Sequence, residues 1–545
     1  MAKRKISLFA VVMTALFILP PPHLANAGES RIENPTGPIF SNTGETVVFD
    51  NLTAMYGAAV YSSTDIQIGS SDTTKHGTLL FSNNAAAGNG GAIFSEYGAV
   101  EFSGGINSFT GNSAGGYGGA IDATAVSIAG GTNTFSQNLA LVGGGAIHSK
   151  GDVSISGGTN MFSENTAHTN YSGEGGAIHG MNISITDGTN TFFKNSGIAA
   201  GAICGVGEVS ISGGTNTFSE NSGSRAYGAV YGGNVSISGG TNTFSGNTAG
   251  ANGAAIFSIN VNISGGTNVF ENNIASDRGG AISSFMSVTL AAKEGEGNGN
   301  ITFRGNTDST GANAIHITAG SEKLTVGAEA NRSVMFYDPI SIQSHYQNAI
   351  VDINQNANQT GTVLFDGSYW DLQGKSGDAY KKSDIYGNTT VHNGTLQLAN
   401  GAVYSTTSTE NGFGLFLLEA AAQLVMDVNS LSDFTRLIAN DITLNGLVTV
   451  DFSDYVSFES DFNLNDLFDG TLGGTTGFEN FEFLAAEGYD AILVNESFVH
   501  FSRQTSPEPQ EPPNPNTTPE PATLLLLSLG LAGLPVVRRR AKQAA

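Results

Sequence analysis

Hydrophobic and polar residues alternate in short runs along residues 45–330, and glycine and asparagine separate these runs. One run is Val153–Ser156, and runs of the same kind begin at Val209, Val235 and Val261. A period of two predicts a β-strand with one buried face. No window of this region places apolar residues at the i, i+3, i+4 and i+7 positions of an amphipathic helix, so the pattern predicts an all-β fold.

Two motifs recur in phase along the same region. The motif F-x-x-N occurs nine times at intervals of 26 to 33 residues, and each copy is followed by G-G-A-I or a near variant. Stacking of these units predicts a right-handed parallel β-helix of about ten coils of roughly 26 residues, with three strand-like pieces in each. Stacked equivalent positions should form a structural ladder of aromatic rings and turn amides. Its members are Phe81, Asn84, Phe109, Asn112, Phe135, Asn138, Phe162, Asn165, Phe192, Asn195, Phe218, Asn221, Phe244, Asn247, Phe270, Asn273, Phe303 and Asn306.

Proline marks the limits of the array. Between Pro38 and Pro507 the sequence contains one proline, Pro339, as expected where every strand must donate backbone hydrogen bonds. Beyond it, strand-like segments no longer keep the spacing of the repeat. We therefore assign residues 28–330 to the β-helix, and residues 331–505 to a continuation of the solenoid followed by a less regular β-rich cap that protects the last coil.

The N-terminal segment is typical of a secretory signal peptide. Three basic residues precede an apolar run, and Ala25 and Ala27 form an A-x-A cleavage site. Prolines interrupt the apolar run after fourteen residues, which is too short for a membrane-spanning helix. We expect residues 1–27 to be removed and the rest to be exported.

The C-terminal end carries several consecutive signals. In order they are a proline-rich linker at residues 506–518, the triplet Pro519, Glu520 and Pro521, an apolar segment at residues 522–537 that we expect to form a transmembrane helix, and the cluster Arg538, Arg539 and Arg540. The arginines should remain cytoplasmic while the body lies outside. A plain tail anchor is the alternative, although sixteen apolar residues are slightly short for one.

This order of signals in residues 519–545 resembles the PEP-CTERM sorting signal of Gram-negative bacteria. The resemblance implies recognition by an exosortase, a membrane-embedded processing enzyme, and cleavage near Pro519–Pro521. It also implies release or attachment at the cell surface, with the C-terminal helix in the membrane until processing.

Composition narrows the class of protein. Of 545 residues 73 are glycine, and only 13% are charged. With 22 Lys and Arg against 47 Asp and Glu, the formal charge of −25 disfavours a nucleic-acid partner. Removal of the two end segments leaves 15 cations and 46 acids, or about −31. The single cysteine, Cys204, excludes an intrachain disulfide and is expected to be a small buried hydrophobic residue.

The paired F-x-x-N and G-G-A-I motifs resemble the repeats of the chlamydial polymorphic outer membrane proteins, a family of autotransporter-type adhesins. Phe336–Ile340 and Gly394–Ala402 also resemble segments of autotransporter passenger domains. The resemblance implies a passenger-like β-helix outside the cell. Members of that family end in a membrane domain, and only about 100 residues separate Gly401 from the proline-rich linker. We therefore expect delivery through the C-terminal sorting signal instead.

Candidate catalytic residues are sparse. Parallel β-helices include polysaccharide lyases and glycoside hydrolases, which use clustered carboxylates. Asn306, Thr307 and Asp308 match the first motif of polygalacturonases, but the Asp-Asp, Gly-His-Gly and Arg-Ile-Lys motifs are absent from the sequence. We assign no catalytic residue and predict a protein that is not an enzyme, with a β-helix polysaccharide lyase or glycoside hydrolase as the alternative.

Three histidines are candidate metal ligands, because His148, His179 and His316 each follow the isoleucine of G-G-A-I. Other repeats carry residues as different as phenylalanine and serine at this position. Because so many different side chains occur there, we expect this position to face outward or to lie in a loop, and not to bind a metal.

Four acids near the C-terminus, Asp451, Asp454, Glu459 and Asp461, lie among aromatic residues. They lack the spacing of a calcium loop, so we expect a solvated strand face. We predict no cofactor and assign no metal ligand. A weak calcium site is the alternative, and we assign no residues to it.

These patterns predict an exported, non-catalytic, adhesin-like or structural β-helical protein of the cell surface, outer membrane or extracellular matrix. Its partners are expected to be glycans or cell-surface proteins, bound by many weak polar contacts along rows of Thr, Asn and Ser. An ice- or mineral-binding face is a weaker option, because the threonines are expected beside asparagine in turns rather than in T-x-T strands.

Overall fold

The structure is a computed structural model, and it describes residues 31–39, 41–69, 72, 76–168, 174–294, 298–318, 322–343, 348–408, 414–455 and 460–504. The predicted signal peptide with Ala25 and Ala27, the proline-rich linker, the sorting triplet, the predicted terminal helix and the arginine cluster lie outside the described residues. Among the residues described, none of the helices has the length and apolar character needed to span a membrane.

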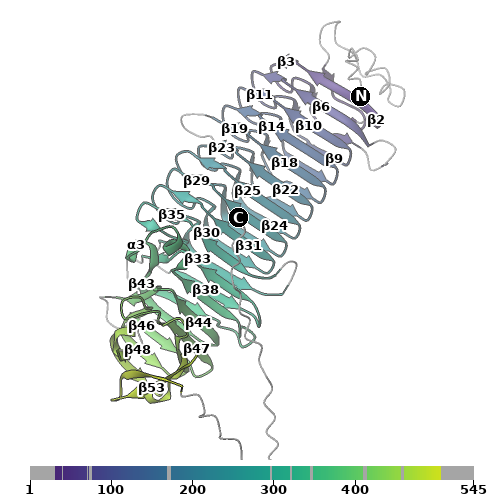
Figure 1. The fold of residues 1–545 in the computed structure, drawn as a ribbon. Coiled ribbons are helices and arrows are strands. Elements are labelled where there is room, and N and C mark those ends of the chain that lie inside the picture. Colours follow the sequence, from purple (N-terminus) through teal and green to yellow (C-terminus); the bar gives the residue numbers. More distant parts are fainter. Residues whose placement is uncertain are drawn as a thin grey trace, which may run out of the picture. The chain divides into compact units, whose positions relative to one another are not determined.

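The described chain winds into a parallel β-solenoid with three long sheets (Figure 1). Strands pair in parallel with the equivalent strand one coil away, as between β14 and β18, except that β36 pairs antiparallel with β35. The 16-stranded sheet contains β2 (Ser41–Asp50), β6 (His76–Ser82), β10 (Ile106–Thr110), β14 (Thr132–Ser136), β18 (Thr159–Ser163), β22 (Thr189–Phe193), β25 (Thr215–Ser219), β28 (Thr241–Ser245), β31 (Thr267–Glu271), β34 (Ile301–Arg304), β39 (Ser333–Phe336), β42 (Thr362–Asp366), β44 (Gly394–Ala399), β47 (Ala422–Asp427), β49 (Leu447–Phe452) and β52 (Glu482–Ala485).

The other two long sheets complete each coil. The 11-stranded sheet contains β3 (Thr53–Ala54), β7 (Ala85–Ala86), β11 (Ser113–Ala114), β15 (Leu139–Ala140), β19 (Thr166–Ala167), β23 (Ser196–Gly197), β26 (Ser222–Gly223), β29 (Thr248–Ala249), β32 (Ile274–Ala275), β35 (Thr307–Asp308) and β36 (Gly311–Ala312). The 24-stranded sheet contains β1 (Ile32–Glu33), β4 (Val60–Ser62), β5 (Ile66–Gly69), β8 (Ile93–Ser95), β9 (Ala99–Ser103), β12 (Ile121–Ala123), β13 (Ala125–Ala129), β16 (Ile147–Ser149), β17 (Val153–Ser156), β20 (Ile178–Gly180), β21 (Ile183–Thr186), β24 (Ile203–Ser212), β27 (Val230–Ser238), β30 (Ile256–Ser264), β33 (Ile282–Ala292), β37 (Ile315–Ile317), β38 (Lys323–Ala328), β40 (Ile340–Ile342), β41 (Ala349–Ile353), β43 (Lys382–Val391), β45 (Val403–Thr407), β46 (Leu415–Leu418), β48 (Arg436–Leu444) and β51 (Phe468–Gly474).

The remaining elements are short. They are the helices α2 (Ser368–Leu372) and α3 (Asp378–Lys381), the 3₁₀ turns η2 (Leu464–Leu467) and η3 (Phe478–Asn480), and a three-stranded sheet of β50 (Phe462–Asn463), β54 (Phe498–Arg503) and β53 (Tyr489–Val494). This small sheet follows the last coil, where Tyr455 stacks on Phe501 with ring centroids 4.6 Å apart. The aromatic side chains there bury apolar surface that the final coil would otherwise leave exposed.

The parallel stacking extends well past the recognisable repeat. The expected count of about ten coils is too low for the whole solenoid, because the 16-stranded sheet continues through β39, β42, β44, β47 and β49. In these later strands leucine and valine replace the repeat motif, for example Leu396 and Leu398 in β44, and both are fully buried. Alternation alone therefore maintains the coil once stacking has begun.

Phenylalanine rings form a continuous stack inside the solenoid. Consecutive rings lie nearly parallel, with centroids 4.5 Å apart at the closest pair, Phe81 and Phe109, and 5.1 Å apart at the widest, Phe303 and Phe336. These spacings match the distance of about 4.8 Å between neighbouring strands. The stack contains Phe49, Phe81, Phe109, Phe135, Phe162, Phe192, Phe218, Phe244, Phe270, Phe303, Phe336 and Phe365.

The asparagines of F-x-x-N form a ladder of buried side-chain amides beside the rings. Asn221 Nδ2 donates to Asn247 Oδ1 at 3.0 Å and to the carbonyl of Phe192 at 2.9 Å. Its Oδ1 accepts from the backbone N and from Nδ2 of Asn195. All four hydrogen-bonding positions of the amide are thereby used, which removes the penalty of burying it.

A second asparagine ladder runs through the T-N-T-F strands. Asn216 Nδ2 donates to Asn242 Oδ1 and to the carbonyl of Gly213, each at 2.9 Å. The same pattern begins at Asn107 and ends at Asn268. This ladder was not among the residues predicted to stack, although an asparagine recurs two residues before each of these phenylalanines.

The threonines of T-N-T-F lie in strands, so the expectation that they lie in turns is wrong. In β14, Thr132 is exposed and Thr134 half-buried, while Asn133 and Phe135 between and after them are buried. The β-strand alternation directs the hydroxyls outward and the amide and ring inward. Rows of Thr and Ser consequently follow the outer face of the 16-stranded sheet.

The second glycine of each pair before these strands is required by close packing, whereas the first position is Asp187 in one coil. Gly214 has φ +63°, and a Cβ there would lie 2.5 Å from the carbonyl oxygen of Gly188 in the preceding coil. Both the left-handed backbone and the close approach exclude a larger residue.

We expect Asn221→Ala to lower the free energy of unfolding by about 2–3 kcal/mol, because its ladder neighbours Asn195 and Asn247 lose partners while buried. The exposed Asn234 is a matched control, and Asn234→Ala should change stability by no more than about 0.5 kcal/mol. Chemical denaturation followed by circular dichroism measures both. Equal effects of the two substitutions would show that the buried ladder contributes no special stability.

Candidate functional site

The residue after G-G-A-I is the position of the repeat that varies most in chemistry. Parallel pairing places these residues in one column along the 24-stranded sheet, as for Ile147 and His148 opposite Ile178 and His179. We call this set the variable column. It contains Phe94, Asp122, His148, His179, Cys204, Tyr231, Phe257, Ser283 and His316.

A buried acid and imidazole occupy the first part of the variable column. Asp122 is fully buried, and its Oδ1 pairs with Nδ1 of His148. Asn89, in the glycine-rich turn of the preceding coil, donates to Asp122 Oδ2 at 2.8 Å. Tyr117 from a similar turn covers His148, with ring centroids 4.3 Å apart. The turn of one coil thus covers the column residue of the next.

In the next coils, residues of other types lie over the variable column. His179 Nε2 lies 2.9 Å from Glu174 Oε2, and the adjacent imidazole holds the pKa of Glu174 below its ordinary value. Burial raises the pKa of the Cys204 thiol, so this side chain is a neutral, small buried group, as the sequence predicts. Further along, Tyr227 stacks between Tyr231 and Phe257, at 4.8 and 3.8 Å.

The variable column is buried except for the half-buried Tyr231, which corrects the expectation of an outward or loop site. His148 and His179 are each 8% exposed and His316 is 1% exposed. The side chains leave the solenoid interior, but the glycine-rich turns fold over them. Variety at this position is tolerated because each column residue has its own covering residue, such as Asn89 over Asp122.

His316 and Ser341 approach the geometry of a base and a nucleophile, with Nδ1 2.7 Å from Oγ. Arg278 lies 3.3 Å from Nε2 and can only donate, so Nε2 must accept and the ring proton must be on Nδ1. Burial, reinforced by Arg278, lowers the pKa of His316 to about 3. The neutral ring therefore donates to Ser341 and cannot remove its proton.

The polygalacturonase-like triplet serves the fold. Asn306 belongs to the F-x-x-N ladder, and Thr307 and Asp308 form β35. Asp308 Oδ1 accepts from the backbone N and from Oγ1 of Thr310, which closes the turn between β35 and β36. The structure places no second acid of this motif beside it among the described residues.

The C-terminal acids do not form one cluster, although Asp451 and Asp454 both lie close enough to Asp427 to raise its pKa. Asp451 lies opposite Asp427, whose pKa is raised to about 7, first by burial and then by Asp451. Asp461 pairs with His500 at 2.7 Å, and Glu459 lies outside the described residues. Within the part of the chain that the structure describes, no group of three or more His, Cys, Asp or Glu side chains is arranged to hold a metal ion.

The ladder of F-x-x-N asparagines ends at Asp338, which the sequence analysis did not identify. Its carboxylate accepts from the backbone N of Gly305 and from both N and Nδ2 of Asn306. Trp370 in α2 donates its Nε1 hydrogen to the same carboxylate at 3.0 Å. Two features of the sequence could have pointed to it. No asparagine follows Phe336 at the spacing of F-x-x-N, and the chain contains a single tryptophan.

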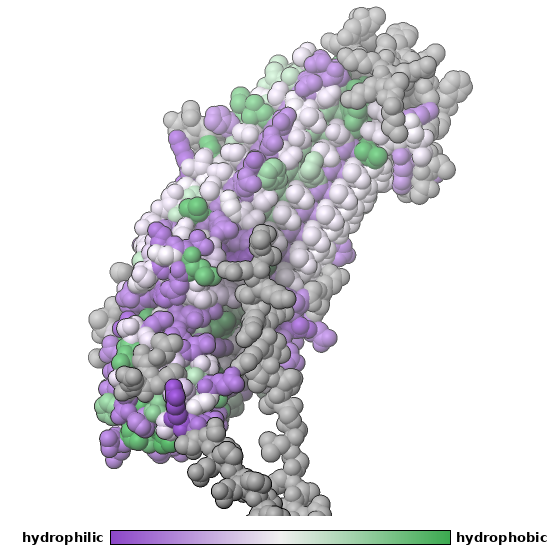
Figure 2. All heavy atoms as spheres, viewed as in Figure 1, coloured by the Kyte–Doolittle hydropathy of each residue, from purple (hydrophilic) through white to green (hydrophobic). Residues whose placement is uncertain are grey.

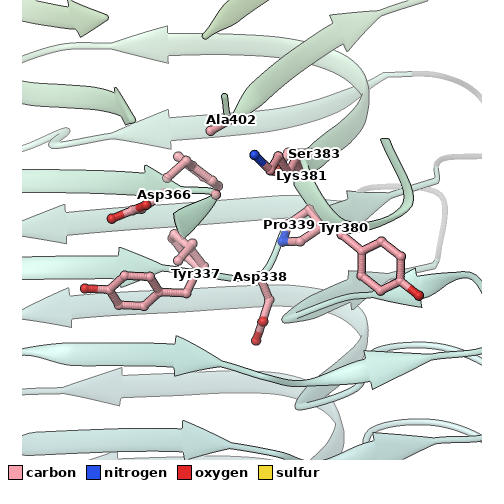
Figure 3. Close-up of a pocket in the computed structure, with 11 residues that line it drawn as sticks. Tyr337, Asp338, Pro339, Asp366, Tyr380, Lys381, Ser383 and Ala402 are labelled. Carbon is pink, nitrogen blue, oxygen red and sulfur yellow. The ribbon is translucent and has the colours of Figure 1, made fainter. Parts of the chain in front are cut away.

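A small hollow lies beside Asp338 (Figure 3). Tyr380 and Lys381 of α3, Asp366 at the end of β42 and Ser383 in β43 contribute to its lining. Its volume of about 10 Å³ is enough for a single water molecule. The hollow is therefore a packing defect at the end of the ladder and too small for a sugar.

The stability contributed by Asp338 should depend on pH. Burial raises the pKa of this carboxyl from its ordinary 3.8 to about 7, against the four hydrogen bonds that favour the ionised form. The folded chain then binds the proton more tightly than the unfolded chain, so stability is lost as the pH rises from about 4 to about 7. Asp338→Asn removes this titration. We expect the stability of the wild type relative to this variant to fall over that interval in denaturation curves, and parallel curves would contradict the assignment.

The covered acid of the variable column is expected to stabilise its coils. Asp122→Ala deprives Asn89 and His148 of their partner while His148 stays buried, and should lower the free energy of unfolding by about 1–3 kcal/mol. Ser283→Ala at the equivalent buried position is the control, with an expected change within about 0.5 kcal/mol. Thermal melts of both variants measure the difference, and an unchanged Asp122→Ala would refute a stabilising pair.

Comparison with known families gives two matches in separate parts of the chain. The model of the PEP-CTERM protein-sorting motif matches residues 517–541. The model of the Chlamydia polymorphic membrane protein repeat matches residues 78–96, 108–124, 134–150 and 269–284. Both resemblances expected from the sequence are thus confirmed.

Curated relatives of the repeat region are named as probable outer membrane proteins. PmpB of Chlamydia muridarum is 27% identical over 28% of this chain and 9% of its own length. In Chlamydia pneumoniae, pmp20 is 28% identical over 32% of this chain and 9% of its length, and pmp8 is 30% identical over 29% of this chain and 18% of its length. The chain therefore spans less than a fifth of these relatives. No solved structure matches it.

The sorting motif and these relatives support an exported protein of the cell surface or outer membrane.

Proposed function

We propose that this chain is a non-catalytic, adhesin-like structural protein that an exosortase sorts to the cell surface. The observation that carries the proposal is the separation of interior from exterior in each coil. Stacked phenylalanines and asparagines fix the interior, while Thr and Ser recur at the outward positions of successive strands. An extended scaffold with a constant core and a repeated polar surface suits binding by many weak contacts.

Neutral polar side chains dominate the surface available for such contacts. The rows of Thr and Ser along the 16-stranded sheet offer hydroxyl donors and acceptors at the strand spacing. Figure 2 shows pale and hydrophilic residues over most of the visible face, with hydrophobic residues scattered among them. We propose glycans or cell-surface proteins as the ligands.

The described side chains favour binding over catalysis. His316 holds its proton toward Ser341, and Asp308 is committed to a turn. The pairing of Asp122 with His148 is covered by Asn89 and Tyr117, so a polymeric substrate does not reach it. None of these groups combines exposure with the paired carboxylates of a glycoside hydrolase.

Protease shaving of intact cells tests the proposed display. We expect peptides of residues 76–504 to be released from wild-type cells, because the sorted body lies outside. Replacement of Pro519, Glu520 and Pro521 by alanine should abolish this release, since the exosortase would lose its recognition triplet. Recovery of the protein only from cytoplasmic fractions would overturn the proposal.

The purified chain should also bind members of a glycan array without altering them. Incubation with neutral and acidic polysaccharides, followed by assays for reducing ends and unsaturated products, should give no product. A reproducible product would replace the binding function with the lyase or hydrolase alternative.

A further inference from the structure

The last strand of the 24-stranded sheet has an open edge. β51 pairs with β48, and with no other strand of the described chain. Residues 469–474 are all exposed, and around Gly473 there is no atom within 4 Å of a Cβ position. Edge strands are usually protected by charge, proline or a covering loop, because unpaired backbone groups accept a further strand. Here Asp469 is the one charged residue of β51.

An interior position is also uncovered at this edge. Leu472 lies opposite Ile442, which is fully buried, so its register is that of a core residue. It is nevertheless 38% exposed, because no further coil of the described chain lies over it. Leu484 and Ile492 are exposed in the same C-terminal region, at 49% and 52%. Figure 2 shows hydrophobic residues at this end, near β53.

The surroundings of the open edge are strongly acidic. Residues 460–504 contain eight acids and one arginine, Arg503, and all eight carboxylates are exposed. The acids are Asp461, Asp466, Asp469, Glu479, Glu482, Glu487, Asp490 and Glu496. Such a field attracts cationic segments and repels anionic ones.

We infer that β51 is a docking edge for an extended, basic peptide segment of a partner protein. The segment would add a strand to the 24-stranded sheet, place an apolar side chain over Leu472 and pair its flanking lysines or arginines with the surrounding carboxylates. This surface is separate from the proposed binding along the solenoid flank.

Charge and backbone chemistry disfavour two other occupants. A second copy would bring either the same acidic end or the N-terminal coil, in which residues 31–62 contain one arginine and three acids. The segment that follows the last strand, residues 505–521, contains seven prolines, which cannot donate to a ladder.

The test uses the full chain and the synthetic peptide KKTVTVTKK, labelled for fluorescence anisotropy. We expect binding that weakens as salt is added, and no binding of KKTPTPTKK, which has the same charge but cannot form a strand. Leu472→Ser should weaken binding about tenfold by removing the apolar contact. Ile492→Ser, an exposed residue of β53, is the matched control and should leave binding unchanged.

Three outcomes would overturn the inference. Equal binding of the proline peptide would show that charge attraction alone accounts for the interaction. An equal loss of affinity in Leu472→Ser and Ile492→Ser would show that the peptide does not bind specifically at β51. A dimer in light scattering that Leu472→Ser disperses would make a second copy the occupant. Because Leu472 is at an edge, its variant should keep the wild-type circular dichroism spectrum and melting temperature, so a loss of binding can be assigned to the edge. Failure of this test leaves the shaving and glycan experiments unaffected.

Discussion

Satisfaction of buried side-chain amides is the constraint on which the repeat region depends. An asparagine amide buried alone costs several kcal/mol, and a column of them would unfold any ordinary core. Here the parallel register places each amide one strand spacing from the next, as between Asn195 and Asn221. The amides satisfy each other only if every coil keeps the same register, so a slip at one coil would break bonds in its neighbours. Two such ladders on either side of the phenylalanine stack therefore select one alignment of the whole array.

The same constraint explains where sequence freedom lies. Ladder and ring positions admit few residues, and the second glycine of each pair leaves no room for a side chain. The variable column is less restricted because its residues also take partners from the adjacent glycine-rich turn, as Asp122 does from Asn89 in addition to His148 one coil away. Asn89 bonds to Asp122, and Arg278 bonds to His316. In both cases a residue of the turn provides a partner for a buried polar side chain of the column. Past Asp338, apolar residues such as Leu396 fill the interior in place of the stacked asparagines, so the repeat motif disappears while the coil persists.

The sequence was most informative where periodicity and stacking coincide. The spacing of F-x-x-N identified the fold and the residues that stack, because residues equivalent in sequence are neighbours in space. It could not reveal partners that are not equivalent, such as Trp370 with Asp338, since the two come from an insertion and from the end of the array. It also misjudged burial at His148, because the cover comes from a turn of the preceding coil. The T-N-T-F asparagines show a missed inference of another kind. Their period is visible in the sequence, but asparagine beside threonine is expected in a turn.

The two ends of the asparagine ladder are chemically different. In the F-x-x-N ladder each amide donates one Nδ2 hydrogen to the next asparagine on the C-terminal side and accepts through Oδ1 from the asparagine on the N-terminal side, so the side-chain hydrogen bonds run in one direction. The donor end of this row lies where Asn306 donates to the carboxylate of Asp338, and the acceptor end lies where Asn84 accepts from the backbone of Leu52. The row of side-chain hydrogen bonds thus has a direction, and a carboxyl group that accepts four hydrogen bonds terminates it at its donor end.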